Sequence, residues 1–218
     1  MPPIKLRVST IERFRALCEE DYVLPQELID AVMRGQQGGP TSWKMDAGSA
    51  WHKVIERPNE SAVGSGLNHR YESGGYSWHC DDVIGMFGAI GSGEQEIRKW
   101  KRYSVGGLTF DVTGQADHVY DRTISDIKTK FTTVNVADYE DSLQWRFYLD
   151  IHQCDAFRYL LCRMSQPKDG CVNLQNITTV RYFAYPQMVA DLEGWLLRFA
   201  EWAEVNGLLP YLTKMGPI

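Results

Sequence analysis

The sequence predicts a mixed α/β (α+β) domain in which helices flank a central mixed sheet with an antiparallel hairpin at its core. Two helical patterns precede position 58, four strand-like segments follow between 95 and 130, and helix, strand and helix patterns end the chain. The 218 residues suit a single domain, 1–218, and 44% hydrophobic residues supply a sizeable core.

The N-terminal part, 1–57, is expected to be helical. Ser9 and Thr10 can cap a first helix. Apolar residues then recur at helical spacing, at Ile11, Phe14 and Leu17. A loop is expected at 36–41 and a second helix at about 44–57.

The next part, 58–93, is expected to be a loop or a flap. Gly, Ser, Asn and His are frequent over 58–82, and no apolar period is sustained there. Loops of this length in compact domains are often functional or disordered.

The last part, 94–218, is expected to hold the sheet core and the C-terminal helices. Gly and Asp-Arg breaks separate segments of strand character. The expected strands are 95–105, 108–113, 115–120, 124–130 and 177–184, and the expected helices are about 138–161 and 186–206.

A pair of aspartates and a lysine stand out in this core. A turn at 121–122 would pair the strands on either side of it, so that Asp117 lies opposite Asp126. Opposed residues have Cβ atoms about 4.5–5.5 Å apart, so two carboxylates there repel one another unless a cation lies between them. Lys128 projects from the same face as Asp126 because side chains alternate along a strand.

These three residues suit metal-assisted phosphoryl chemistry. Mg²⁺ prefers carboxylate oxygens, water and substrate phosphate oxygens as ligands. A lysine beside it can orient the attacking water, help to deprotonate it, or stabilise the transition state. The alternative is a surface hairpin whose charges are only solvated.

The same residues resemble a known nuclease superfamily. Asp117, Asp126, Ile127 and Lys128 match the D…D-x-K core of the PD-(D/E)XK nucleases, which have the restriction endonuclease-like fold. Other motifs resemble the RecB-like exonuclease branch, which includes stand-alone exonucleases of phages and bacteria. They are the helical segment 9–18, the GSAWH sequence of 48–52 with Glu56, and the QxxxY motif of Gln144 and Tyr148.

This resemblance implies a metal centre. Its ligands would be His52, Asp117, Asp126 and the backbone carbonyl of Ile127, and its ion Mg²⁺ or Mn²⁺, with the histidine favouring acceptance of Mn²⁺. Gly48 lies one helical turn before His52 and would let that helix pack close to the sheet. The alternative for His52 is a core histidine satisfied by hydrogen bonds.

The resemblance also implies that Gln144 and Tyr148 bind substrate. They lie on one helix face and would contact a DNA phosphate or position Lys128. The alternative is a pair of ordinary polar residues on a helix surface. Glu56 and Glu96 are weaker candidates for the surroundings of the metal, and for both we favour solvated carboxylates.

Two features bear on DNA as the partner. Basic and aromatic residues interleave over 98–103, a mixture that suits phosphate contact and base stacking. Alternation places Lys99, Lys101 and Tyr103 on one strand face, although a solvated face with aromatic core residues is an equal reading.

His118 alternates away from Asp117, so we do not expect it at the metal. The net charge of −5 counts mildly against nucleic acid without excluding it.

Several other classes of protein are not expected. The five cysteines are widely spaced, so no iron–sulfur cluster, zinc ribbon or disulfide framework is predicted. The sequence contains no GxxxxGK[ST] phosphate loop, no apolar run long enough to span a bilayer and no secretory signal. A cytoplasmic location is expected, in the host cytoplasm if the protein is viral.

We therefore expect a metal-dependent deoxyribonuclease, with exonuclease action on linear DNA in recombination or repair. Possible partners are a strand-annealing recombination protein and further copies of the chain. The alternatives are a sequence-specific or structure-specific endonuclease, a non-catalytic DNA-binding protein with the same fold, and an RNA-directed nuclease.

Overall fold

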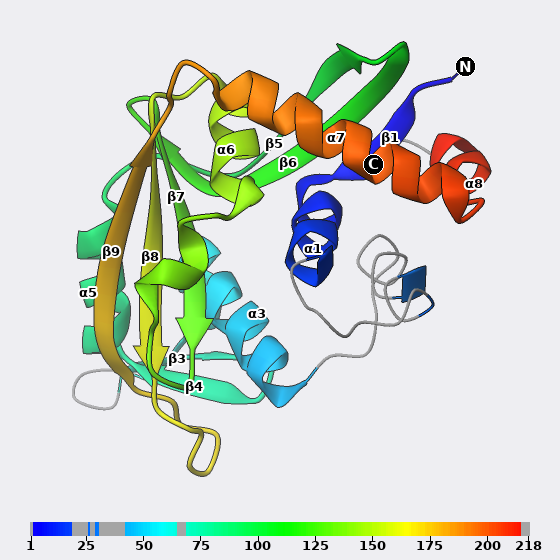
Figure 1. The fold of residues 1–218 in the computed structure, drawn as a ribbon. Coiled ribbons are helices and arrows are strands. Elements are labelled where there is room, and N and C mark those ends of the chain that lie inside the picture. Colours follow the sequence, from blue (N-terminus) through cyan, green and yellow to red (C-terminus); the bar gives the residue numbers. More distant parts are fainter. Residues whose placement is uncertain (1, 19–25, 27–28, 31–41, 65–68, 215–218) are drawn as a thin grey trace.

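A six-stranded mixed sheet forms the centre of the molecule (Figure 1). The computed structural model describes residues 2–18, 26, 29–30, 42–64 and 69–214. The strand order is β1-β6-β7-β8-β9, and β5 pairs with β6. The strands are β1 (Ile4–Arg7), β5 (Glu94–Val105), β6 (Leu108–Tyr120), β7 (Thr123–Lys130), β8 (Ala156–Met164) and β9 (Leu174–Phe183). β1–β6 and β7–β8 are parallel pairs, so the predicted fold class is confirmed.

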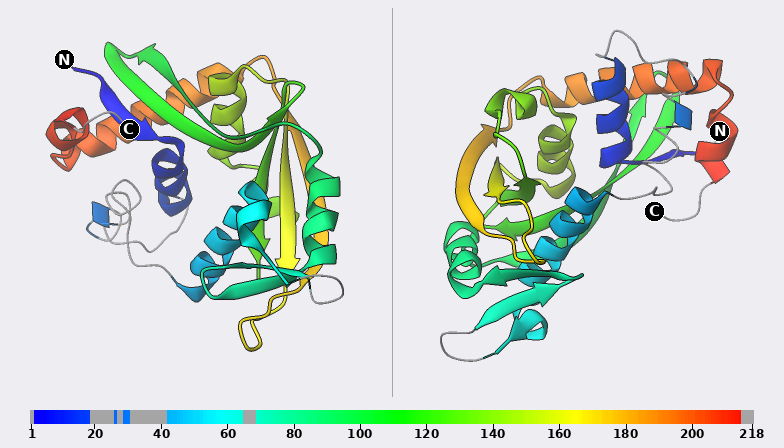
Figure 2. Two further views of the ribbon diagram at one scale, coloured as in Figure 1. Left: turned by 180° about the vertical axis from the view of Figure 1, so that it is seen from behind. Right: turned by 90° about the horizontal axis from the view of Figure 1, so that it is seen from below.

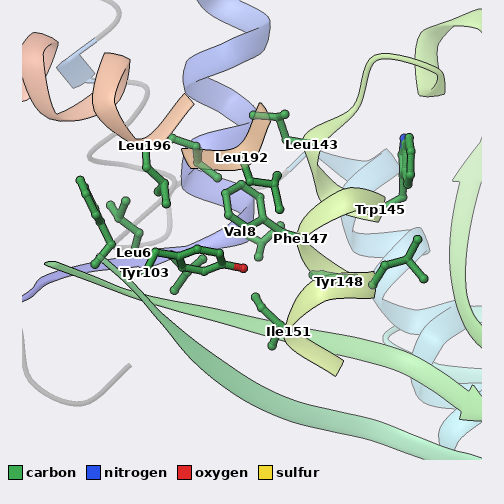
Figure 3. Close-up of a cluster of buried hydrophobic side chains, with 14 of the residues drawn as sticks. Leu6, Val8, Tyr103, Leu143, Trp145, Phe147, Tyr148, Ile151, Leu192 and Leu196 are labelled. Carbon is green, nitrogen blue, oxygen red and sulfur yellow. The ribbon is translucent and has the colours of Figure 1, made fainter. Parts of the chain in front are cut away.

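Helices cover both faces of β7 and β8. On one face, α6 (Leu143–His152) packs in a cluster with α1 (Val8–Cys18) and α7 (Met188–Val205). Figure 3 shows Phe147 of α6 in this cluster, near Tyr103 of β5 and Leu192 of α7. On the other face, α3 (Trp43–Glu56) and α5 (Cys80–Ile90) pack over Ile127 in a second cluster.

The ends of the helices follow local rules. The Ser42 side chain accepts a hydrogen bond from the Met45 N–H and caps α3. Gln153 has a left-handed φ of 58° and ends α6. A short 3₁₀ helix, η2 (Val136–Tyr139), precedes α6, and α8 (Leu209–Lys214) follows α7. Among the described residues, no helix has the length and apolar character needed to cross a bilayer.

The expectation of a loop or flap over 58–93 is wrong for the described residues. They form α4 (Pro58–Ser61), α5 and a small antiparallel sheet of three short strands. These are β2 (Ala62–Val63), β3 (Arg70–Ser73) and β4 (Tyr76–His79). Strands of two to four residues are too short to show a sequence period, and glycines interrupt the apolar pattern of α5.

Two other boundaries differ from the prediction. The helix expected at about 138–161 ends at His152, and Ala156–Met164 is a buried strand. A short apolar run of this kind fits a helix or a strand equally well. Gly114 does not break β6, which is continuous; the glycine leaves room for the Tyr148 ring, since a Cβ there would lie 2.9 Å from it.

The N-terminus also differs. β1 was not predicted, and α1 begins at Val8, so Ser9 and Thr10 lie inside the helix rather than capping it. The loop predicted at 36–41 lies outside the described residues.

Candidate active site

The candidate site lies where β6 and β7 separate. The predicted hairpin register is confirmed for the pairs nearest the turn, from Tyr120 with Thr123 to His118 with Ser125, but the ladder does not include the expected pair of Asp117 and Asp126. The ladder ends at His118, and the Asp117 carboxylate accepts a hydrogen bond of 2.7 Å from the Ile127 backbone N–H. The Asp117 side chain thus takes the place of the next backbone hydrogen bond between β6 and β7. The gap that this leaves between the strands at Asp117 and Ile127 is called the notch below.

Helix α3 places His52 at this notch. A Cβ on Gly48 would lie 2.7 Å from the Thr129 Oγ1, so glycine is needed for the close approach of α3 to β7. His52 Nε2 donates to the Ile127 carbonyl at 3.0 Å, and its Nδ1 lies 3.7 Å from the Asp117 Oδ2. Burial lowers the pKa of His52, which favours the neutral imidazole that a metal requires.

Strand β5 adds a third donor. Gln95 pairs with His118 and Ile97 with Ala116, so Glu96 lies opposite Asp117, with a left-handed φ of 54°. One ligand atom each of His52, Glu96 and Asp117 lies within 4.8 Å of the other two. These three side chains line a cleft of about 640 Å³ and could hold a metal ion.

The second aspartate faces a different set of partners. Lys128 Nζ lies 2.7 Å from the Asp126 Oδ2, and Gln144 Nε2 donates to the Asp126 Oδ1 at 2.8 Å. Burial lowers the pKa of Lys128, but Asp126 and Asp117 raise it by more, so the net shift is upward. The lysine is therefore a fixed cation in this structure.

Helix α6 carries the predicted QxxxY pair. Gln144 holds Asp126 rather than Lys128, whereas Tyr148 is buried against Gly114 of β6. Burial and the Asp126 charge raise the pKa of Tyr148 to about 12. Tyr148 thus remains a neutral hydroxyl at the wall of the site.

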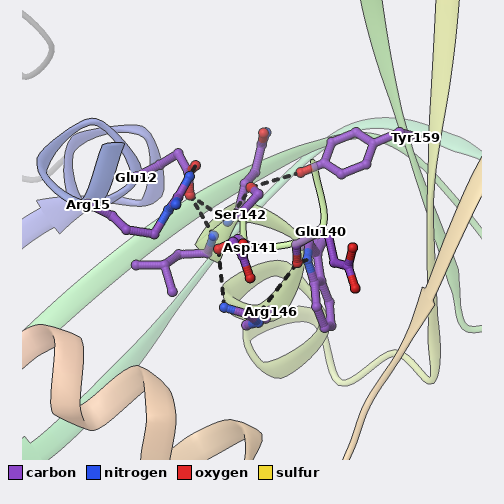
Figure 4. Close-up of polar contacts among 10 residues, drawn as sticks. Glu12, Arg15, Glu140, Asp141, Ser142, Arg146 and Tyr159 are labelled. Carbon is purple, nitrogen blue, oxygen red and sulfur yellow. Dashed lines mark hydrogen bonds and ion pairs between the residues drawn. The ribbon is translucent and has the colours of Figure 1, made fainter. Parts of the chain in front are cut away.

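Glu12 of α1 holds the N-terminus of α6 (Figure 4). Its Oε2 accepts hydrogen bonds from the backbone N–H groups of Leu143 at 2.6 Å and Gln144 at 3.2 Å. Its Oε1 lies 2.8 Å from the Arg15 guanidinium. The first turn of a helix stabilises negative charge, so Glu12 fixes the turn from which Gln144 reaches Asp126. The sequence offered no signal for this contact, because it joins residues 131 positions apart.

The charges at the notch suit a divalent cation. Burial and repulsion by Asp126 raise the pKa of Asp117 well above its usual range. Burial and a hydrogen bond to Glu96 raise the pKa of Glu56 to about 7. Carboxylate and carbonyl oxygens are the ligands that Mg²⁺ and Mn²⁺ prefer, and a cation would offset the surplus negative charge.

The predicted residues thus fall into two adjoining groups. His52, Asp117 and the Ile127 carbonyl meet at the notch, while Asp126 binds Lys128 and Gln144 beside it. Glu96 is more central than predicted. Pairing β5 and β6 about the Gly106-Gly107 turn would have placed it opposite Asp117.

His118 lies away from the notch, as expected. It is buried, and its ring would touch a Cβ placed on Gly93. Burial and the Arg158 charge lower its pKa.

No protein-family model and no curated protein matches the sequence, but solved structures match the fold. LHK-Exo in complex with dAMP aligns with a TM-score of 0.55 at 12% identity, covering 96% of this chain and 92% of that one. A second structure of LHK-Exo, an alkaline exonuclease from Laribacter hongkongensis, aligns with a TM-score of 0.52 at 12% identity. The chain has the fold of an alkaline exonuclease. SSO0001 aligns with a TM-score of 0.51 at 14% identity, covering 92% of this chain and 75% of that one.

Proposed function

We propose that the protein is a divalent-metal-dependent deoxyribonuclease that degrades linear DNA from its ends in recombination or repair. The observation that carries the proposal is the convergence of His52, Glu96 and Asp117 at a cleft beside the Asp126–Lys128 pair. The fold shared with an alkaline exonuclease supports it, and so does the nucleoside monophosphate bound by that protein.

We assign Mg²⁺ or Mn²⁺ to His52, Asp117, Asp126 and the Ile127 carbonyl, with Glu96 as a further candidate ligand. When bound, such an ion supplies an activated water and offsets charge that develops on the phosphoryl group. The two carboxylates are held apart by different partners, since Asp117 is bound by the Ile127 N–H and Asp126 by Gln144. Both are therefore oriented before substrate arrives.

Lys128 has an electrostatic role in this proposal. The neighbouring carboxylates raise its pKa, so the ammonium remains protonated and can stabilise an oxyanion on the phosphate. About a third of its side chain is exposed, which leaves it accessible to a substrate phosphate. Gln144 positions Asp126, and Asp126 in turn fixes Lys128.

The test uses end-labelled linear duplex, covalently closed circular DNA and the matched RNA, each with Mg²⁺, Mn²⁺ or EDTA. We expect the wild type to degrade only linear DNA in the presence of metal, with polarity given by the label. Lys128→Ala should be inactive, and Lys168→Ala, a lysine in the β8–β9 connection, is the matched control that should retain activity.

Each other result points to another function. Cutting of the circle would replace exonuclease with endonuclease action, and preference for RNA would replace DNA as substrate. Binding without cleavage under every metal condition would indicate a non-catalytic DNA-binding protein and would refute the proposal.

A further inference from the structure

Beyond the notch, β5 and β6 continue as a long antiparallel ribbon, and β1 pairs with the other edge of β6 along part of its length (Figure 1). One face of the ribbon packs against α6, where Lys101 Nζ and Tyr103 Oη both lie within 2.7 Å of the Asp150 carboxylate. Trp100 directly precedes Lys101, so alternation turns its side chain to the opposite face, where it is 60% exposed. In the left view of Figure 2, the ribbon lies in front of α7 with no helix drawn over it.

The exposed face carries side chains in cross-strand rows. Arg98 of β5 pairs with Gln115 of β6, and Trp100 pairs with Thr113. Arg7 of β1 pairs with Thr113 from the other side, so Arg7, Thr113 and Trp100 form one row across three strands. Successive rows on one face lie about 6.8 Å apart, because a strand rises about 3.4 Å per residue.

These rows lead into the candidate metal centre. Gln115 donates its amide N–H to the Glu96 carboxylate and accepts hydrogen bonds from Arg98 Nε at 3.1 Å and Nη2 at 2.7 Å. A hollow of about 190 Å³, lined in part by Arg7, Arg98 and Gln115, adjoins this contact. The rows and the metal cleft therefore share one continuous surface.

The charges on this face are divided between two roles. The Arg102 guanidinium is held by both oxygens of Asp111, at 2.7 and 2.9 Å, and lies 5.7 Å from the centre of the Trp100 ring. Within the described residues, no carboxylate forms an ion pair with Arg7 or Arg98. Arg7 and Arg98 therefore offer positive charge to an anion, while Arg102 stiffens the position of the indole.

We propose that this face is a platform for single-stranded DNA. A single strand lies along the rows, with one base stacked on Trp100 and phosphates bound by Arg98 and Arg7. Stacking on an exposed indole requires an unpaired base, because the faces of paired bases are already stacked in a duplex. The proposed function enters only in one respect: it implies that the bound strand runs toward the metal cleft.

The test measures binding in EDTA, so that no cleavage contributes. The probe is a fluorescein-labelled oligothymidylate, followed by anisotropy at low salt, with a duplex of equal length alongside. Trp100→Ala should weaken binding of the single strand by about 5- to 150-fold, because stacking contributes about 1–3 kcal/mol per base. Trp100→Phe should restore most of the affinity. Phe183→Ala is the matched control, since Phe183 of β9 is 62% exposed and lies outside this face.

A second arm tests the charge. Arg98→Ala should reduce the slope of log affinity against log salt by about one, as expected for one lost phosphate contact, whereas Trp100→Ala should leave the slope unchanged. An unchanged slope in Arg98→Ala would overturn the phosphate assignment.

The outcomes separate this proposal from the proposed function. The platform is refuted if the wild type does not bind the single strand in EDTA, or if Trp100→Ala binds as the wild type does. It is also refuted if duplex binding falls as much as single-strand binding in that variant. If the platform behaves as expected and metal-dependent cleavage is absent, the proposed function fails while the platform stands.

Discussion

The two ends of α6 each hold a buried aspartate, and the two sites differ in charge balance. At the start of the helix, Gln144 binds Asp126, which also contacts Lys128 but has Asp117 as a charged neighbour. At its end, Asp150 is itself part of the helix and binds one lysine and one tyrosine of β5.

This difference in charge balance indicates that the first end of α6 is a binding site and that the second end is a structural contact. A buried carboxylate balanced by one cation and one hydroxyl needs no further partner. At the first end two carboxylates share one lysine, and burial together with the charge of Asp126 raises the pKa of Asp117. We therefore expect substitutions at the first end to change activity and those at the second to change stability.

The largest expected effect is on activity at the first end. Asp117→Asn should lower nuclease activity by about 10³-fold or more, since it removes a charged metal ligand. In EDTA, the same variant should unfold at an equal or higher temperature than the wild type, because burial and Asp126 disfavour the ionised carboxylate. Asp150→Asn is the matched control and should retain activity within a few-fold. Activity of Asp117→Asn near that of the wild type would remove the distinction between the two ends.

The next effect is on stability at the second end. Asp150→Ala should lower the free energy of unfolding by about 2–4 kcal/mol, because it leaves the buried Tyr103 hydroxyl and the Lys101 ammonium without their partner. Urea unfolding in EDTA measures this loss. Asp155→Ala, which removes an exposed ion pair with Arg122, should cost far less, because solvent screens the attraction between exposed charges. Equal losses in the two variants would contradict a structural role for Asp150.

How far the sequence predicts these two ends depends on the distance between the residues. The hairpin of Asp117 and Asp126 follows from strand alternation and a two-residue turn, so its register was correct. The Asp150 contacts join α6 to β5 across almost 50 positions, and no local period reports them. The position of Glu96 was predictable in principle, because it depends on the hairpin of β5 and β6, and the Gly106-Gly107 turn of that hairpin is visible in the sequence.

The same limit explains the boundary of α6 itself. The sequence-based prediction extended this helix to about Leu161, whereas Ala156–Met164 is a buried strand. Its continuous apolar run carries no period that separates strand from helix, and the left-handed Gln153 that ends α6 is not a glycine. The nuclease motifs could be found from the sequence, whereas the packing that orients them required the tertiary structure.

A smaller effect is expected where α1 meets the first end. Glu12→Ala should destabilise the protein by about 1–2 kcal/mol, the usual effect of losing a helix cap, and should loosen the turn that carries Gln144. We expect kcat to fall by about tenfold with little change in KM, because the substrate does not contact Glu12. Glu12→Gln keeps an acceptor and should recover part of both losses. A fall in stability with unchanged kcat would show that Glu12 does not position Gln144 for the reaction.

The smallest expected effect concerns the pH dependence of the second end. Burial, with the Lys99 charge, lowers the pKa of His152 to about 4, whereas the unfolded chain takes up a proton near pH 6.5. The folded state therefore loses stability as the pH falls through this range, by about 1 kcal/mol between pH 7 and 5.5. His152→Gln cannot take up the proton, so its free energy of unfolding should fall less than that of the wild type over the same interval. Urea unfolding at the two pH values in EDTA gives the loss of stability for each protein. Titration of Asp117 contributes equally to both proteins, so it cancels when the two losses are compared. Parallel losses in the wild type and His152→Gln would mean that the end of α6 accepts a charged imidazole, and the charge balance assigned to that end would then be wrong.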